Sequence, residues 1–154
     1  TGTTAGTILI TPSFAMHGGF DLTPATPDAL TIAIPRMAPK LGSATISSQT
    51  TAGFTLVLSG YSTTRGMRQL DIQFTPKAGE NFSATKLTID VSTAASGWYQ
   101  SAASQSSGGA FAAAIPISLA NGSSTDDLVH RLQSLSITAT NDAGVSTAVT
   151  VPIP

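Results

Sequence analysis

The chain has 154 residues, seven basic and eight acidic side chains, a net charge of −1 and no cysteine, and 41% of its residues are hydrophobic. This balance excludes a disordered chain, and the absence of any run of Lys or Arg excludes the charge pattern of nucleic-acid and anionic-membrane binders. No apolar stretch approaches the roughly 20 residues of a spanning helix, so we expect no membrane insertion. Without cysteine the chain has neither disulfides nor thiolate metal sites.

The first 34 residues predict a pair of strands joined by a long connection. Thr7 to Ile10 is typical of a strand, as is the segment with Leu30, Ile32 and Ile34, and Gly18 with Gly19 predicts a turn between them. Residues 35–39 then read Pro-Arg-Met-Ala-Pro, an extended linker, because proline has no backbone donor and disfavours helix before it. We therefore divide the chain into 1–38, the last strands of a preceding β module with a linker, and 39–154, one further β module.

The two N-terminal strands cannot by themselves pair all of their backbone groups or cover their apolar side chains. Two strands leave an apolar face that water cannot satisfy, formed by Ile8, Ile10, Leu30, Ile32 and Ile34. This segment must pack on its own chain, pair with a second copy or stay poorly ordered. Because it alternates cleanly and carries few charges, we expect an ordered segment and a homodimer formed through residues 1–34.

The remainder of the chain alternates between apolar and polar residues, the pattern of strands with one face on a core. Short strands at intervals of about ten residues predict two antiparallel sheets packed as a β-sandwich over residues 43–152. Helical pattern is confined to 125–132, with Thr125 as N-cap, and to another turn or two over 96–104. Asn141 to Gly144 predicts a tight hairpin. The residues expected to point inward are Phe54, Leu56, Leu58, Leu70, Ile72, Phe74, Leu87, Ile89, Val91, Ile115, Ile117, Leu135, Ile137 and Val149.

Three segments carry a family resemblance: GFTLVLSGYSTTR from Gly53, GWYQSAAS from Gly97, and TNDAGVS from Thr140. With them, the chain from about Ala44 to Val151 resembles the C-terminal immunoglobulin-like or fibronectin-III-like modules of long secreted bacterial proteins. The resemblance implies an immunoglobulin-like β-sandwich, a secreted or cell-surface location, neighbouring domains of the parent protein as partners, and a spacer or presentation role. It supplies no catalytic residues.

Trp98 and Tyr99 form the most prominent candidate site. Aromatic faces on a β-sandwich are platforms for sugar rings, which would make this a carbohydrate-binding module with a cell-surface polysaccharide as ligand. The alternative is structural, with the indole plugging one end of the core between two strands. In that case Trp98 is mostly buried, and Trp98→Ala costs on the order of 3 kcal/mol through the cavity it leaves.

Tyr61 and Arg65 form the second candidate site, in a Ser/Thr-rich loop after a strong strand. The guanidinium fork suits an anionic or polar ligand. In the structural interpretation Tyr61 bonds nearby backbone at a sheet corner, and Arg65 stacks over it or pairs with Asp71.

Metal and catalytic chemistry find little support. Asp90, Asp126, Asp127 and Asp142 lack the spacing of a calcium loop, and neither His17 nor His130 has the i, i+4 partner of a helical zinc site. The chain has no Gly-x-Ser-x-Gly elbow, and Glu80, the sole glutamate, sits in a turn-like segment. We therefore expect no metal, no cofactor and no enzyme, but a structural or interaction module for spacing or adhesion, with a cell-surface protein as a further candidate partner.

Overall fold

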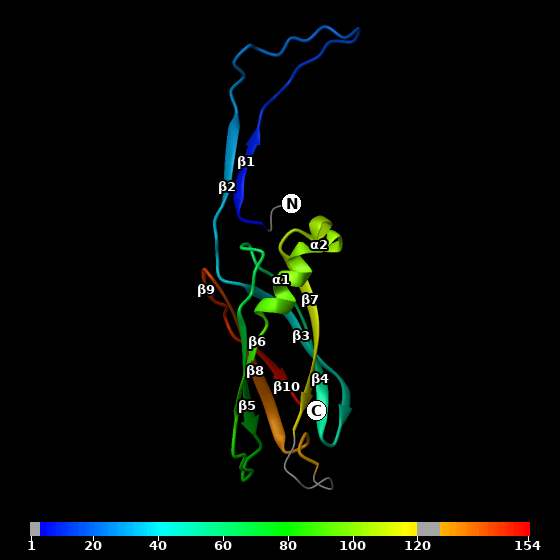
Figure 1. Cartoon of the computed structure of the whole chain (residues 1–154), viewed down its shortest axis with the longest axis vertical. Helices are drawn as coiled ribbons and strands as arrows, with labels where there is room; N and C mark the ends of the chain where they lie inside the picture. The colour runs from blue at the N-terminus through cyan, green and yellow to red at the C-terminus, as the bar shows by residue number, and fades with distance from the viewer. Residues whose placement is uncertain (1–3, 120–126) are drawn as a thin grey trace.

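The structure is a computed structural model that describes residues 4–119 and 127–154, and its elements form two antiparallel sheets with a hairpin projecting from them (Figure 1). In chain order the elements are β1 (Gly6–Ile10), β2 (Leu30–Ile34), β3 (Lys40–Thr50), β4 (Gly53–Tyr61), β5 (Gln69–Pro76), β6 (Lys86–Asp90), α1 (Ser92–Gln100), α2 (Ala102–Ser107), β7 (Ala110–Ser118), β8 (Leu132–Asn141), β9 (Gly144–Val145) and β10 (Val149–Pro152). We call the part from β3 to β10 the body.

The two sheets of the body share one hydrophobic core. One sheet has the order β3-β4-β7, and the other has the order β10-β8-β5-β6 with β9 paired to β8. Alternation places every second residue inward, so Leu56, Leu58, Ile72 and Ile137 are fully covered. All fourteen residues expected to face inward lie in this core or pack against it, which confirms the predicted inner faces of these strands.

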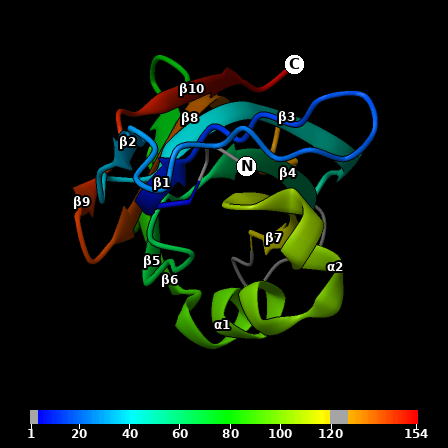
Figure 2. The same cartoon turned by 90° about the horizontal axis from the view of Figure 1, so that it is seen from above.

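The two side edges of the body differ. At one edge β10 lies against β3, whereas at the opposite edge β6 and β7 stand apart. Figure 2 shows α1 lying across this second side, at the end nearest the projecting hairpin. The core is therefore closed by strands along one edge and by a short helix at one end of the other.

The helices correct part of the prediction. Helical structure around 96–104 extends further than expected, into α1 and α2, and Ser101 caps α2 by accepting the Ser104 N–H. The helix predicted over 125–132 is wrong for the described residues, because Leu132 begins β8 and the N–H groups of Leu128 and Val129 donate to the Thr51 carbonyl instead. Thr125 and Asp126 lie outside the described residues. Three apolar residues of that segment are nevertheless buried: Leu128, Val129 and Leu132.

The hairpin predicted at Asn141 to Gly144 is confirmed. Asn141 pairs with Gly144, whose φ of 142° suits glycine, and the Asn141 Oδ1 accepts the N–H groups of Ala143 and Gly144. The buried Asn141 amide also donates to the Met37 carbonyl and to the hydroxyls of Ser62 and Thr64. This side chain therefore joins the end of β8 to the linker before β3.

We call residues 5–34 the arm; its two strands form a separate sheet that points away from the body (Figure 1). The strands pair with Ile8 opposite Ile32 and Ile10 opposite Leu30, and the connection beyond them turns at Gly18 and Gly19, as predicted. Among the three expected outcomes for this segment, packing on its own chain is not what the structure has, because the strand residues are almost all exposed.

None of the helices in the described parts of the chain has the length and apolar character needed to cross a membrane.

Candidate functional site

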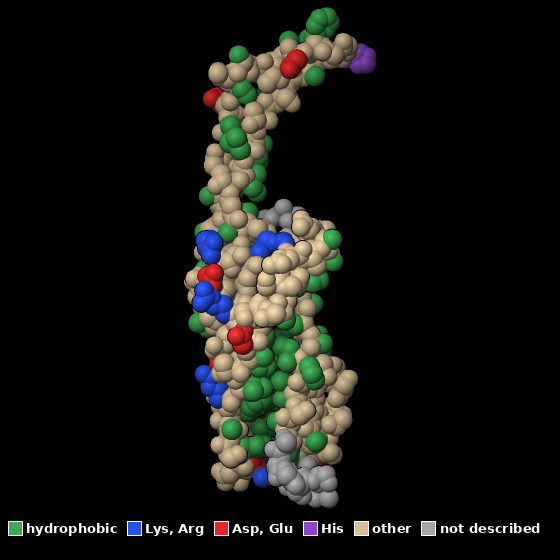
Figure 3. Space-filling model, in the orientation of Figure 1, with side chains coloured by type: hydrophobic (Ala, Val, Ile, Leu, Met, Phe, Trp, Pro, Cys, Tyr) green, Lys and Arg blue, Asp and Glu red, His purple; other side chains and the backbone are tan. Residues whose placement is uncertain are grey.

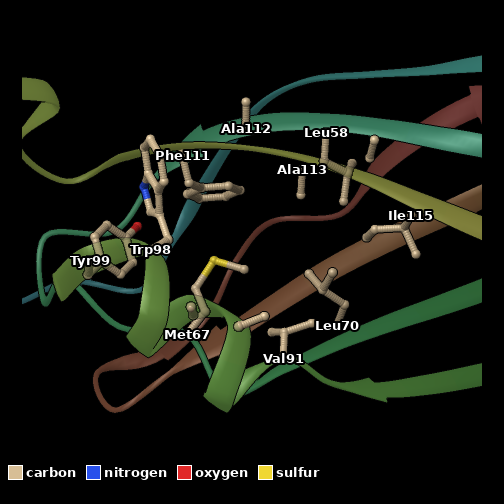
Figure 4. Close-up of a pocket in the computed structure, with 13 residues that line it drawn as sticks. Leu58, Met67, Leu70, Val91, Trp98, Tyr99, Phe111, Ala112, Ala113 and Ile115 are labelled. Carbon is tan, nitrogen blue, oxygen red and sulfur yellow. The ribbon is translucent and has the colours of Figure 1, made fainter. Parts of the chain in front are cut away.

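A pocket of about 250 Å³ opens beside α1, and we call it the capped pocket. Figure 4 shows Trp98 and Phe111 side by side at one end and Leu70 with Ile115 at the other. The lining side chains come from β4, the β4–β5 loop, β5, the residue after β6, α1 and β7, and none is charged: Leu58, Met67, Leu70, Val91, Ala94, Ala95, Trp98, Tyr99, Phe111, Ala112, Ala113, Ala114 and Ile115.

The two aromatic residues that the sequence pointed to play different parts in this pocket. Tyr99 is buried, with 6% of its surface exposed, whereas Trp98 retains 36% and stands at the rim. The helix explains the difference, because Tyr99 follows Ala95 by four residues on the inner face and Trp98 lies one position to the side. The prediction that the Trp98 indole plugs this end of the core is therefore wrong: Tyr99 is the buried aromatic residue, and Trp98 is only partly covered.

The polar ends of both aromatic side chains are engaged by backbone. The Trp98 Nε1–H donates to the Ala110 carbonyl at 3.0 Å, and the Tyr99 hydroxyl donates to the Gly109 carbonyl at 2.9 Å. Burial raises the pKa of Tyr99 to about 12, although the nearby Arg65 charge acts in the opposite direction. With both donors used, the capped pocket suits an apolar group such as one aliphatic or aromatic side chain.

Arg65 holds the helices against the β4–β5 loop. Its guanidinium donates to the carbonyl oxygens of Tyr99, Ser104 and Gly108, the last at 2.5 Å, and to the Ser104 hydroxyl. It also lies 5.4 Å from the centre of the Tyr99 ring. Carbonyls at helix C-termini carry partial negative charge, so this cation is neutralised by backbone, and no carboxylate of the described residues pairs with it.

Tyr61 has a different structural role from Arg65, Trp98 and Tyr99. Tyr61 is half-buried at the end of β4, where its backbone pairs with Lys40 and Ala110. Arg65 stacks over Tyr99 rather than over Tyr61, and Asp71 pairs with Lys86 at 3.2 Å rather than with Arg65. The sequence did not indicate the Arg65 and Tyr99 contact, because a gap of 34 residues hides it.

A groove continues from the capped pocket along the open side of the body, and we call it the edge groove. Its walls are Leu87 and Ile89 from β6, Val91 directly after β6, and Ala113 and Ile115 from β7, all of them half-buried. Figure 3 shows a band of hydrophobic side chains running along the body below the helices. The core is therefore accessible to an apolar group along this side.

The arm presents a second uncovered apolar surface. One face of its two strands carries Ile8, Ile10, Leu30, Ile32 and Ile34, which the register places together. Ile8 and Ile10 are 39% and 47% exposed. Towards the tip, further large apolar side chains are exposed: Phe14, Met16, Phe20 and Leu22.

Titratable groups do not gather into a reactive centre in the described residues. Three or more metal-ligating side chains nowhere come together there, and His130 pairs instead with Asp127. In comparisons with known proteins, no family model and no curated protein matches the chain.

Proposed function

We propose that the chain is a non-catalytic interaction module, immunoglobulin-like in fold, of a secreted or cell-surface bacterial protein. The uncovered apolar face of the arm carries this proposal. The body serves as a spacer that holds the arm in place, and the arm is the part that makes contact. The resemblance of residues 44–151 to secreted bacterial modules supports the location, and the many hydroxyl side chains suit exposed sheet faces.

The amount of apolar surface on the arm favours an interaction role. Nine large apolar residues between Ile8 and Ile32 are 39% to 73% exposed. At about 200 Å² for a fully exposed residue, they offer on the order of 1,000 Å² over the whole arm, of which roughly 400 Å² lies on the one face of Ile8, Ile10, Leu30 and Ile32. Contiguous apolar patches of about 300–600 Å² on monomers are often functional. Two strands alone are also only marginally stable in water. A partner that covers this surface explains why the segment is kept apolar.

The alternative is a carbohydrate-binding module that uses Trp98 and Tyr99. It is favoured by the 36% exposure of Trp98, which leaves part of the indole open to a sugar ring. Against it, sugars need hydrogen-bonding groups, and the donors of both aromatic side chains already bond backbone carbonyls. The interaction module is therefore the better supported proposal.

A bead-retention assay tests the proposal. Beads coated with the full chain are passed over three kinds of surface: the same chain, envelope proteins of bacteria, and polysaccharides such as cellulose, chitin and peptidoglycan. The variants are Ile8→Thr with Ile32→Thr, which keeps β-propensity on the arm, and Trp98→Phe, which keeps an aromatic ring. We expect beads to be retained on a protein-coated surface. Retention should be lost in the arm variant and unchanged in Trp98→Phe.

Two outcomes would count against the interaction module. Retention on a polysaccharide that is lost in Trp98→Phe would favour the carbohydrate-binding alternative. Beads that are retained on no surface, with both variants folded by circular dichroism, would contradict an interaction role.

A further inference from the structure

The chain carries two uncovered apolar surfaces that differ in shape. The arm is a narrow, projecting ribbon with aliphatic side chains on one face, and the edge groove is a channel between β6 and β7 that ends in the capped pocket. A narrow ribbon has the shape needed to enter a channel. The body edge opposite the groove is closed by β3 and β10, so the groove is where the core is open.

An arm does not reach the groove of its own chain. It points away from the body along the long axis (Figure 1). The chain segments at the two ends of the arm both bond Thr63. The Ala5 N–H donates to the Thr63 carbonyl at 2.6 Å, and the Met37 N–H donates to the Thr63 hydroxyl at 2.8 Å. Asn141 then holds the Met37 carbonyl at 2.9 Å. Folding the arm back onto the groove would break these contacts.

Charge permits two copies to bring these surfaces together. From residue 4 to residue 34 the charged side chains are Asp21 and Asp28, both in the connection between the strands, and His17 lies there too. The walls of the edge groove and the lining of the capped pocket are uncharged. Contact between the strands of the arm and the groove therefore takes no charged group out of water. The free-energy cost of desolvating a charge is absent from this contact.

The apolar area is sufficient for a stable contact. On the aliphatic face Ile8, Ile10, Leu30 and Ile32 are 39% to 60% exposed and offer roughly 400 Å². The groove that receives this face is covered over a similar area, so each chain that gives its arm and receives another buries about the 800 Å² of a standard interface. The capped pocket has room for one large side chain, the kind of anchor that dominates binding energy in many interfaces.

The open edge of β7 favours docking through side chains over strand addition. Pro116 lies within β7 opposite Thr55 of β4, and proline has no N–H to offer. An added strand would meet a missing donor there. The aliphatic face of the arm needs no backbone partner in order to pack into the groove.

From these observations we propose that the arm of one chain packs its aliphatic face into the edge groove of a second copy of the same chain, with one large arm side chain in the capped pocket. The proposal rests on the interaction function proposed above and names the partner. Two copies that exchange arms form a closed dimer, and copies that pass arms on in one direction form a longer chain.

Disulfide trapping tests the contact directly, because the chain has no cysteine of its own. Single-cysteine variants Ile10→Cys on the arm and Ala113→Cys in the groove are mixed in the full chain, with one of the two carrying a mass tag. Thr150→Cys, on the exposed face of β10, is the matched control for the groove variant. We expect tagged Ile10→Cys to link to Ala113→Cys about tenfold more than to Thr150→Cys, as for a central interface position.

A second measurement keeps the proposal falsifiable if a groove variant fails to fold. Sedimentation of the full chain should show masses above 15.6 kDa at high concentration. Ile8→Thr with Ile32→Thr, which alters no core residue, should weaken that association about tenfold or more. Ala113→Trp should do the same by filling the groove, while Thr150→Trp should not.

The results that overturn the proposal are distinct from those that overturn the interaction function. Dominant Ile10 to Ile10 links would mean that arms pair with each other. A chain that stays monomeric, with no link above the Thr150→Cys control, would rule out a second copy as the partner. Arm-dependent bead retention on envelope proteins alone would then leave the interaction function standing with another partner.

Discussion

Replacing Arg65 removes the group that joins the helices to the rest of the body. Arg65→Met keeps most of the side chain's length and its Cβ but deletes the charge and every donor. The carbonyls of Tyr99, Ser104 and Gly108 then lose their partner. Because these carbonyls end the two helices, their loss of partner destabilises the attachment of α1 and α2.

The magnitude follows from the contacts. A hydrogen bond to a charged group contributes about 1.5–3 kcal/mol, and a cation over an aromatic ring about 0.5–1 kcal/mol. Water reaches the half-buried site in the variant and replaces part of the loss, so the contributions do not add fully. We expect Arg65→Met to lower the free energy of unfolding by about 3 kcal/mol, a large part of the 5–15 kcal/mol typical of a domain.

Urea unfolding followed by two signals measures this effect. Far-ultraviolet circular dichroism reports the sheets, and Trp98 fluorescence reports the helix end, because Trp98 is the single tryptophan and its indole is bonded to the Ala110 carbonyl. In Arg65→Met the fluorescence transition should move to lower urea. Arg65→Lys, which keeps the charge but loses the planar fork, should recover about half of the loss.

The reasoning about Arg65 is refuted if Arg65→Met lies within about 0.5 kcal/mol of the unaltered chain, the range of an ordinary surface substitution. It is also refuted if Arg65→Lys and Arg65→Met are equally destabilising, since charge would then play no part.

Four further substitutions test other parts of the structure. Burial raises the pKa of Tyr99 from 10.0 to about 12, so the free energy of unfolding that this residue contributes is fully present below about pH 10 and falls by roughly 2–3 kcal/mol as the pH rises through about 12. Tyr99→Phe should lack this loss in urea titrations at pH 8 and above pH 11; equal losses in the two proteins argue against it. Asn141→Ala leaves buried partners unsatisfied and should cost about 2–4 kcal/mol, lowering the melting temperature by roughly 10 °C; a shift below about 3 °C contradicts this. Gly53→Ala places a Cβ 2.4 Å from the Ile117 carbonyl oxygen and should destabilise by about 2 kcal/mol or more, whereas Gly97→Ala, in open space within α1, should stabilise by up to about 1 kcal/mol; thermal melts that reverse this order disprove the packing argument.

Local pattern was sufficient to predict the core. Alternation in β4, β5 and β8 identifies which side chains face inward, since a strand has only two faces and one must be covered. Asn141 and Gly144 were equally predictable, because a two-residue hairpin needs residues that tolerate its backbone.

The candidate site was less predictable because its contacts join distant parts of the chain. Arg65 reaches Tyr99 and Gly108 across 34 and 43 positions, and nothing in the local sequence selects them over Tyr61 or Asp71. The predicted helix at 125–132 failed for a similar reason: Thr51, far away in sequence, takes the N–H groups that a helix would use internally. The apolar arm was predictable, but its direction away from the body depends on contacts at Thr63.

The fixing of the arm at Thr63 has a mechanical consequence. Thr63 follows β4 of one sheet, and Met37, which it binds, is also bound by Asn141 at the end of β8 in the other sheet. A pull on the arm is therefore transmitted to both sheets at once. Tension on the arm therefore loads hydrogen bonds that join both sheets, and it does not act on a single edge strand alone.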